Sequence, residues 1–404
     1  MPFWQRFRHS EETATKTEVP PTKPSKTAAV DSSESVGISL TDSLDKFGFV
    51  LLQRECSRRS RENVFISPMS IFLSLAMMEK GAGGETKLAL RKALALATET
   101  SEQAINDSTV LLMKRLRLQQ GGELDIANAL WANADFTIAP EFMHVCQEIY
   151  DATVRTLDLN QPSSAAVINE WVTEKTRGKI SQIVTPAGIV GLPAILTNAV
   201  YFKGKFLDPF PKEATQPRTF YLAAGREKLV PMMQKTGLSG AYRSGKKSEA
   251  AALHYRNSNI VFFVILPQKG ISPEEALTED FSTLIVEHDV ELDLLMPRFR
   301  IEFNSGLRES LTSMGTGIAF QYPGADFSGI GSRLFYISDV LHKTLLEVDE
   351  EGTVAAAATG VLMAAASSLR VPQRRQLMFD RPFAVVLRDY TSSATLFAGV
   401  VYEP

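Results

Sequence analysis

The sequence is poor in the residues that build disulfide frameworks and metal sites. Its 404 residues include two cysteines and five histidines. Cys56 and Cys146 stand in neither a Cys-x-x-Cys nor a Cys/His spacing, which excludes a disulfide framework and argues against a zinc site. A single bridge would need a proximity that the sequence does not show. We expect both thiols to be reduced and packed in the interior, and we expect no metal or cofactor.

Long apolar runs and a recognisable leader peptide are also missing. No uninterrupted apolar run approaches the roughly 18 residues of a membrane-spanning helix. The first residues, MPFWQRFR, lack the apolar stretch and the small-residue cleavage site of a secretory signal. We therefore expect a chain that is not bound to a membrane and that is either cytoplasmic or exported by an unconventional route.

Charge and composition exclude further classes of protein. A formal net charge of −3 and 44% hydrophobic residues are typical of a soluble globular protein, and no excess of positive charge points to nucleic acid. Residues 10–37 are rich in Thr, Lys, Glu, Pro and Ser, and they cannot bury enough apolar surface to offset the entropy of ordering. The interpretation is a disordered tail over residues 1–38 and one folded domain over residues 39–404.

Within that domain, helical patterns precede strand patterns. Apolar residues at three- and four-residue intervals predict a helix from residue 39, with Ser39 or Thr41 as its N-cap. Further helices are predicted after Ser67-Pro68 and near residues 85–94, 101–119, 139–150 and 164–176. Strands are predicted at residues 124–131, 194–202, 260–266, 291–297, 335–337, 345–348, 382–387 and 394–401. This order indicates an α+β fold with a large mixed or antiparallel sheet.

The sequence carries no complete enzyme motif. Gly81, Gly83 and Gly84 end a helical pattern and no Gly-Lys-Ser/Thr follows them, which is typical of a helix stop and not of a phosphate loop. Neither Gly-x-Ser-x-Gly nor His-Glu-x-x-His occurs. His342 lies in a segment dense with other signals, but the sequence places no nucleophile and no orienting acid beside it. We expect no catalytic activity.

The most informative segment is rich in alanine and runs from Glu347 to Ser368. Its composition alone favours a helix. However, Gly352 and Gly360 weaken a helix, and no apolar stripe is present. Read as an extended chain, one face carries small residues first and larger ones later: Thr353, Ala355, Ala357, Thr359, Val361 and Met363. Such a strand can slide between two packed strands without a steric clash.

This segment resembles the hinge of the reactive-centre loop of serpins, a family of protease inhibitors. The resemblance covers the folded chain, in the family's order, at residues 63–70, 168–172, 197–205, 339–343, 380–383 and 396–399. It implies a single domain with helices packed on a large mixed central sheet, smaller sheets, and an exposed reactive-centre loop at about residues 350–379. It also implies a monomer whose partner is a target protease.

The resemblance implies a mechanism as well. In inhibitory serpins the protease forms an acyl-enzyme with the cut loop, which then inserts into the central sheet and carries the enzyme with it, so each inhibitor acts once on a serine or cysteine endopeptidase. The alternative is a non-inhibitory serpin that acts as a carrier, chaperone or storage protein, but such members commonly have a charged or bulky residue or a proline in the hinge. The hinge residues here are Glu350, Gly352, Thr353, Ala355, Ala356, Ala357 and Ala358.

Two polar clusters follow from the resemblance. The shutter cluster, beneath the centre of the sheet, comprises Ser67, Ser70, Asn198 and His342. The breach cluster, where the loop enters the sheet, comprises Phe206, Arg298 and Glu350. Phe206 replaces the family's usual tryptophan and loses the indole N–H, which leaves the hydrogen bonding at that end of the sheet open.

The position of the scissile bond decides the target class. The family's spacing places it at Ala366-Ser367, which suits an elastase-like protease with a small pocket. The following segment is slightly long and contains arginines, so Arg370-Val371 with a trypsin-like target is the alternative. Arg374 and Arg375 are either a solvated face or an exosite for an acidic partner.

Overall fold

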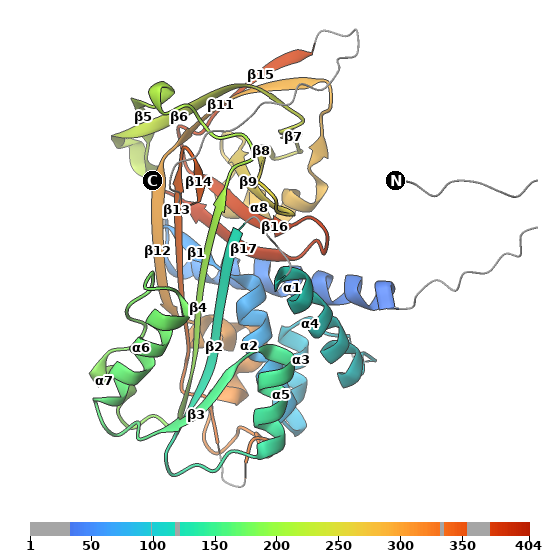
Figure 1. The fold of residues 1–404 in the computed structure, drawn as a ribbon, viewed down its shortest axis with the longest axis vertical. Helices are drawn as coiled ribbons and strands as arrows, with labels where there is room; N and C mark the ends of the chain where they lie inside the picture. The colour runs from blue at the N-terminus through green and yellow to red at the C-terminus, as the bar shows by residue number, and fades with distance from the viewer. Residues whose placement is uncertain (1–32, 98, 118–121, 332–334, 354–371) are drawn as a thin grey trace, which may run out of the picture.

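Helices pack against three β-sheets in the computed structural model, which describes residues 33–97, 99–117, 122–331, 335–353 and 372–404 (Figure 1). The helices are α1 (Ser33–Arg58), α2 (Pro68–Gly81), α3 (Gly84–Ala93), α4 (Glu102–Arg117), α5 (Pro140–Tyr150), α6 (Ser164–Lys175), α7 (Pro186–Ile189), α8 (Pro273–Asp280) and α9 (Arg308–Leu311). The expected α+β fold is confirmed.

The strands lie in sheets of six, seven and four members. The sheet of six, called the central sheet below, has the order β12 (Phe299–Gly306), β13 (Val340–Asp349), β14 (Gly352–Thr353), β4 (Ala194–Lys205), β2 (Gly122–Asn133) and β3 (Thr153–Leu157). The sheet of seven has the order β1 (Val64–Ile66), β17 (Thr395–Val401), β16 (Phe383–Asp389), β9 (Ile260–Pro267), β8 (Ser248–His254), β7 (Tyr242–Ser244) and β10 (Ile285–Val286). The sheet of four has the order β15 (Gln373–Met378), β11 (Val290–Pro297), β6 (Glu227–Ser239) and β5 (Gln216–Tyr221).

The central sheet is mixed. β13 runs parallel to β4 and β2 runs parallel to β3, whereas β12 with β13 and β2 with β4 are antiparallel. Its long strands run vertically in Figure 1, below the sheet that contains β5, β6, β11 and β15, with α6 and α7 over one face. The predicted large mixed sheet is therefore confirmed.

Side chains along β2 point alternately to the two faces of the central sheet, and each face is covered by different helices. Leu130 belongs to the main apolar core, which includes α2, while its neighbour Trp131 belongs to a second core with α6. The Trp131 ring meets the Trp171 ring of α6 edge to face at 5.4 Å. α2 is buried along nearly its whole length, as expected for a helix that is apolar on all sides. The centre of the sheet therefore lies between two helical layers.

Two expectations about local structure are wrong. α1 begins at Ser33, so Ser39 and Thr41 lie inside the helix and neither can be its N-cap. Residues 335–337 form no strand, because Ile337 donates its backbone N–H to Ala319 and the chain enters β13 only at Val340. The apolar run there is buried as a connection. By contrast, the other predicted helices and strands are present within a few residues of their expected bounds.

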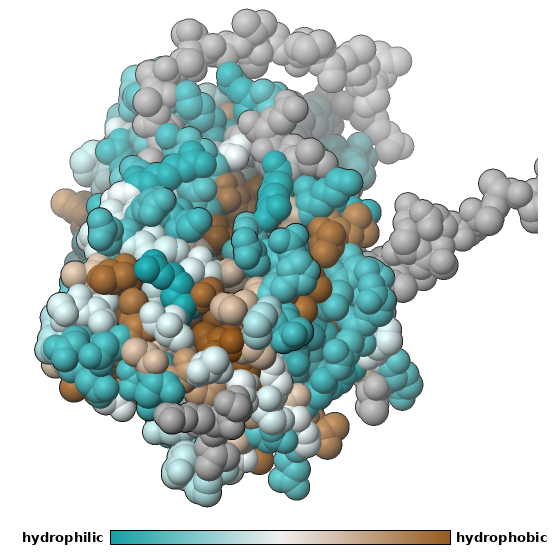
Figure 2. Space-filling model, turned by 60° about the horizontal axis from the view of Figure 1, so that its bottom comes forward, coloured by the Kyte–Doolittle hydropathy of each residue, from teal (hydrophilic) through white to brown (hydrophobic). Residues whose placement is uncertain are grey.

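The surface shows small hydrophobic patches separated by polar residues on the face that Figure 2 presents. The exposed large apolar side chains belong to many different elements, among them Leu88 in α3, Leu229 in β6 and Ile285 in β10. Such scatter is ordinary for a protein surface in water. Cys56 and Cys146 are buried and unbridged, as predicted, and burial raises the pKa of both thiols.

Candidate functional site

The segment predicted to begin the reactive-centre loop lies inside the central sheet at Gly352 and Thr353. β14 pairs antiparallel with β13 on one side, where Thr353 is opposite Val348, and with β4 on the other, where Thr353 is opposite Gly204. Gly352 has a φ of +144°, and a Cβ there would lie 2.2 Å from the Gly204 carbonyl oxygen. Only glycine fits this position without moving β4.

Aromatic side chains hold the buried end of β14. The Thr353 side chain is fully buried, and its hydroxyl lies 2.6 Å from the Tyr255 hydroxyl. The Tyr255 ring stacks on the Phe206 ring with centroids 5.2 Å apart. Phenylalanine at position 206 has no indole N–H to donate, and the pair of hydroxyls on Tyr255 and Thr353 supplies a hydrogen bond at this end of the sheet instead. Phe206 itself contributes its backbone N–H, which donates to the Glu351 carbonyl oxygen at 2.8 Å.

Glu350 anchors the chain just before β14. Its side chain is 3% exposed and accepts hydrogen bonds from Arg298 Nη2 at 2.5 Å and from Thr215 Oγ1 at 2.6 Å. Its carbonyl oxygen accepts the Phe210 N–H at 2.7 Å. Burial alone would raise the pKa of the Glu350 carboxyl, but the hydrogen bonds from Arg298 and Thr215 outweigh it and hold the pKa below its ordinary value. The structure thus brings the three predicted breach residues to one end of the central sheet.

Replacing Glu350 with glutamine tests this anchor. The variant keeps the shape of the side chain and loses the charge, so we expect the free energy of unfolding in urea at pH 7 to fall by about 1–2 kcal/mol. Because the folded-state pKa of Glu350 is lowered, its stabilisation is present above about pH 4.3 and is lost as the pH falls through the folded value. The difference between variant and wild type should therefore shrink below pH 4. Glu347→Gln, in the preceding strand β13, is the matched control, and an equal effect of both variants would contradict the anchoring role.

The four predicted shutter residues also lie together, under the middle of the central sheet. Ser67 and Ser70 belong to the start of α2, where Ser67 caps the helix, while Asn198 and His342 stand opposite each other on β4 and β13. The Ser67 hydroxyl donates to the Leu396 carbonyl oxygen at 2.7 Å, and Asn198 Nδ2 donates to the Ser70 hydroxyl. This network links the first turn of α2 to both strands.

The contacts of His342 fix the tautomer of its ring. Nε2 accepts the Ser67 backbone N–H at 3.1 Å, so Nδ1 must carry the proton and donate it to Asn198 Oδ1 at 2.5 Å. The side chain is fully buried, and burial lowers the pKa of His342 to about 3. A second proton on Nε2 would face the Ser67 N–H. His342 is thus a neutral structural group, and in the described part of the chain its ring nitrogens bond only to the Ser67 backbone N–H and to Asn198.

Several members of these clusters escaped sequence analysis. Asn128 of β2 accepts hydrogen bonds from Ser70 at 3.0 Å and from Asn198, and Ser74 accepts a further bond from Asn198 at 3.2 Å. Asn128 is a polar residue between alanines on a strand that is otherwise apolar there, and that signal marks it. Thr215 and Tyr255 carry no such signal, because their partners Glu350 and Thr353 are remote in the sequence.

Part of the predicted site lies outside the described residues. This part comprises the remaining hinge residues and both alternative scissile bonds: Ala355, Ala356, Ala357, Ala358, Ala366, Ser367, Arg370 and Val371. The chain is described again from residue 372, and β15 presents exposed arginines at 374 and 375. Arg374 lies 3.6 Å from Glu291 of the neighbouring β11.

The described residues hold no candidate membrane helix and no candidate metal site. None of their helices combines the length and apolar character needed to cross a membrane. Within the same residues, no three His, Cys, Asp or Glu side chains are grouped to hold a metal ion.

Comparisons with known proteins identify the family. The family model described as "Serpin (serine protease inhibitor)" matches residues 42–404. Antithrombin-III of Mus musculus is 32% identical over 86% of this chain and 78% of its own length, and Serine protease inhibitor 42Dd of Drosophila melanogaster is 33% identical over 85% of this chain and 92% of its own. Among solved structures, the native thermophilic serpin tengpin is 27% identical, with a TM-score of 0.80 and coverage of 95% of this chain and 97% of its own. The chain belongs to the serpin family.

Proposed function

We propose that this serpin is an inhibitor that acts once on a serine or cysteine endopeptidase. Cleavage of the reactive-centre loop leaves the protease bound as an acyl-enzyme, and the cut loop then inserts into the central sheet. Two relatives at 32–33% identity carry the names antithrombin-III and serine protease inhibitor, and these names support the proposal. The solved structures related to this chain include thyroxine-binding globulin at 24% identity, a likeness of fold alone.

The placement of β14 carries the proposal. Gly352 and Thr353 lie between β13 and β4, antiparallel to both, so the loop enters the sheet with its direction and register already fixed. Below this point β13 and β4 pair directly with each other, from Val340 and Leu196 to Leu345 and Tyr201. Insertion extends β14 along the same line and separates this pair. The small residues that follow Thr353 in the sequence suit such an extension.

If the register of β14 is continued along the inserting loop, it predicts which loop residue reaches the shutter cluster. Thr353 is opposite Val348 and Gly204, so six residues further along the loop Thr359 would be opposite His342 and Asn198, which stand six residues earlier on their strands. Thr359 would therefore enter between the two side chains that join β13 and β4 through the shutter cluster. The hydroxyl of Thr359 can accept or donate a hydrogen bond there, which compensates the contact it displaces.

The driving force follows from strand pairing. One parallel contact between β13 and β4 is exchanged for two antiparallel ladders, and antiparallel pairing is slightly more stable per residue. The intact loop is held at both ends and cannot gain this stability, whereas the cleaved loop can.

The expected target is an elastase-like protease that cleaves Ala366-Ser367, with cleavage at Arg370-Val371 by a trypsin-like protease as the alternative. Incubation with an elastase should give a covalent complex that survives SDS, and mass spectrometry of the released peptide identifies the bond. An elastase whose catalytic serine is replaced by alanine should give no complex, because no acyl-enzyme can form. Elastase that cleaves the loop and remains fully active would contradict inhibition of this target.

Heating the cleaved protein tests the mechanism independently of the target. Any protease that cuts within residues 354–371 should raise the midpoint of thermal unfolding by at least about 10 °C, because the inserted strand adds two hydrogen-bonded ladders. Cleavage that leaves the midpoint unchanged would contradict insertion and would favour the carrier, chaperone or storage role.

A further inference from the structure

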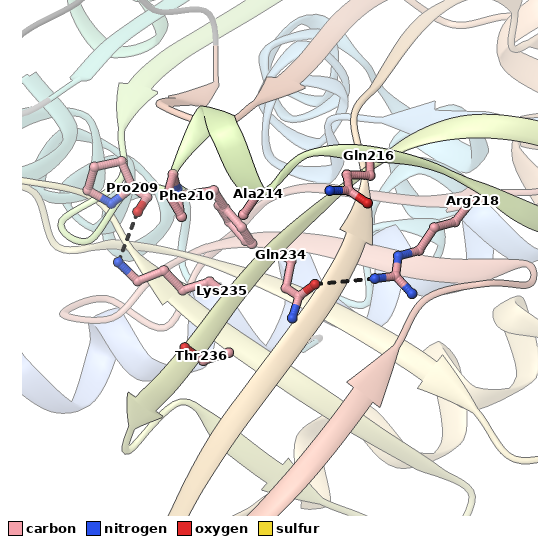
Figure 3. Close-up of a pocket in the computed structure, with 9 residues that line it drawn as sticks. Pro209, Phe210, Ala214, Gln216, Arg218, Gln234, Lys235 and Thr236 are labelled. Atoms are coloured by element: carbon pink, nitrogen blue, oxygen red, sulfur yellow. Dashed lines mark hydrogen bonds between the residues drawn. The ribbon is translucent and has the colours of Figure 1, made fainter.

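A cavity of about 670 Å³ lies beside the start of the reactive-centre loop, and neither of the predicted clusters uses it (Figure 3). Pro209, Phe210 and Ala214, from the connection between β4 and β5, line one side of the cavity. Gln216 and Arg218 of β5 line it together with Gln234 and Lys235 of β6. This volume is within the range of small-molecule sites in proteins. We refer to it as the β5 cavity.

Polar side chains of β5 face the inner side of the sheet of four at this cavity. Gln216 stands opposite Met232, and Arg218 stands opposite Val230. Opposite residues of an antiparallel pair point to the same face, and Met232 and Val230 are both buried. Gln216 and Arg218 therefore lie on the face where apolar packing is expected, yet both remain exposed at the cavity.

The two cations of the β5 cavity differ in their partners. Lys235 is neutralised by an ion pair with Asp208 and also donates to the Pro209 carbonyl oxygen at 2.9 Å. Among the described residues, Arg218 forms no ion pair, and its one hydrogen bond, to Gln234 Oε1, is long at 3.4 Å. The cavity thus holds one uncompensated positive charge with amide donors beside it. Pro209, Phe210 and Ala214 supply an apolar wall opposite.

We propose that the β5 cavity binds a small organic anion whose ring packs against Pro209 and Phe210 and whose carboxylate pairs with Arg218. A carboxylate accepts two parallel N–H bonds from a guanidinium, and the Gln234 amide can turn its N–H group toward the same oxygen atoms. Neutral ligands of the same shape would use only the apolar wall and should bind more weakly.

The connection between β4 and β5, which lines the β5 cavity, also contacts the predicted hinge. The Phe210 N–H donates to the Glu350 carbonyl oxygen, Thr215 donates to the Glu350 carboxylate, and Lys212 Nζ lies 2.6 Å from Glu351 Oε1. A ligand that braces this wall against β5 and β6 holds these contacts in place. Occupation of the cavity therefore restrains the start of the loop, a consequence that rests on the inhibitory function proposed above.

Binding is tested with 2-naphthoate as the anion and 2-naphthamide as its neutral counterpart, by calorimetric titration of the intact protein without protease. We expect 2-naphthoate to bind more tightly than 2-naphthamide and Arg218→Gln to weaken 2-naphthoate binding by about 10- to 100-fold, the usual effect of losing a charge-assisted hydrogen bond. The same variant should leave 2-naphthamide unaffected. Arg226→Gln, an exposed arginine of the same hairpin outside the cavity, should not change either affinity. Equal affinity of both probes, or of wild type and Arg218→Gln for the anion, overturns the site.

Coupling to the hinge is tested by the rate of covalent complex formation with an elastase. Saturating 2-naphthoate should slow this rate several-fold in the wild type and leave the rate of Arg218→Gln unchanged. Binding that is retained without an effect on the rate overturns the coupling. If the protein inhibits no protease, the titration still decides whether the anion site exists, so the two proposals fail separately.

Discussion

Under the proposed mechanism, replacing Thr353 with arginine is expected to turn an inhibitor into a substrate of its target protease. The Thr353 side chain is fully buried between β13 and β4, with its hydroxyl on Tyr255. An arginine there must bury a charge without a partner, at a cost of about 3–5 kcal/mol or more. The arginine should therefore keep residue 353 out of the sheet in the intact protein, so that insertion has to bury the charge. Hydrolysis of the acyl-enzyme is then faster than insertion, and we expect the fraction of protease trapped to fall about 100-fold.

The partition between trapping and hydrolysis is measured by titrating the protease with each variant and counting covalent complex against cleaved, released inhibitor. Thr353→Val keeps the size of the side chain and loses only the contact with Tyr255, so it should still inhibit. Gln373→Arg places an arginine at an exposed position of β15, beyond both alternative scissile bonds, and should behave like the wild type. Undiminished complex formation by Thr353→Arg would contradict the proposal that Thr353 occupies the sheet during inhibition.

A hinge could be predicted from the sequence because the prediction depends on local composition. Small residues alternating along an extended chain after Gly352 are visible without a structure, and so is the loss of helix propensity at Gly352 and Gly360. The insertion of β14 could not be predicted in this way. It depends on Gly204 and Val348 approaching Thr353 from two other strands, and strand register is set by tertiary packing.

The two polar clusters also contain some residues that the sequence predicts and some that only the structure reveals. The family resemblance placed Ser67, Ser70, Asn198 and His342 in one cluster, and Ser67-Pro68 also marked the start of a helix in the sequence. Asn128 of β2 also belongs to this network, and Tyr255, which follows β8, belongs to the breach cluster. No local sequence pattern predicts the hydrogen-bond partner of either residue. At residues 335–337 the sequence predicted a strand that the structure does not contain. A buried connection has the same apolar composition as a buried strand, so composition alone does not distinguish them.

The second large effect that we expect is a loss of folding stability at acidic pH that depends on His342. Its pKa in the folded protein is about 3, below the ordinary value of about 6.5, because the ring is fully buried and neutral. The unfolded chain therefore binds a proton that the folded chain does not. The stability that His342 contributes is complete above about pH 6.5 and falls by about 1.4 kcal/mol per pH unit as the pH decreases toward 3.

His342→Gln should remove this dependence and keep the contacts. The glutamine amide can accept the Ser67 N–H and donate to Asn198, as the neutral ring does, but it does not titrate. His342→Ala leaves both groups without a partner and should lower the free energy of unfolding at pH 7.5 by about 1–3 kcal/mol for each.

The measurement is urea unfolding of wild type and variants between pH 7.5 and 4.5. The slope against pH in His342→Gln should be smaller than in the wild type by about one proton, while His144→Gln, at an exposed position of α5, should keep the wild-type slope. Every other ionisable group is the same in wild type and His342→Gln, so the difference between their slopes isolates His342. Identical slopes in wild type and His342→Gln would mean that the ring is not held neutral between Ser67 and Asn198. Protonation of His342 in mildly acidic conditions would then leave the junction of β13 and β4 intact, and the shutter cluster could not be the contact that loop insertion has to open.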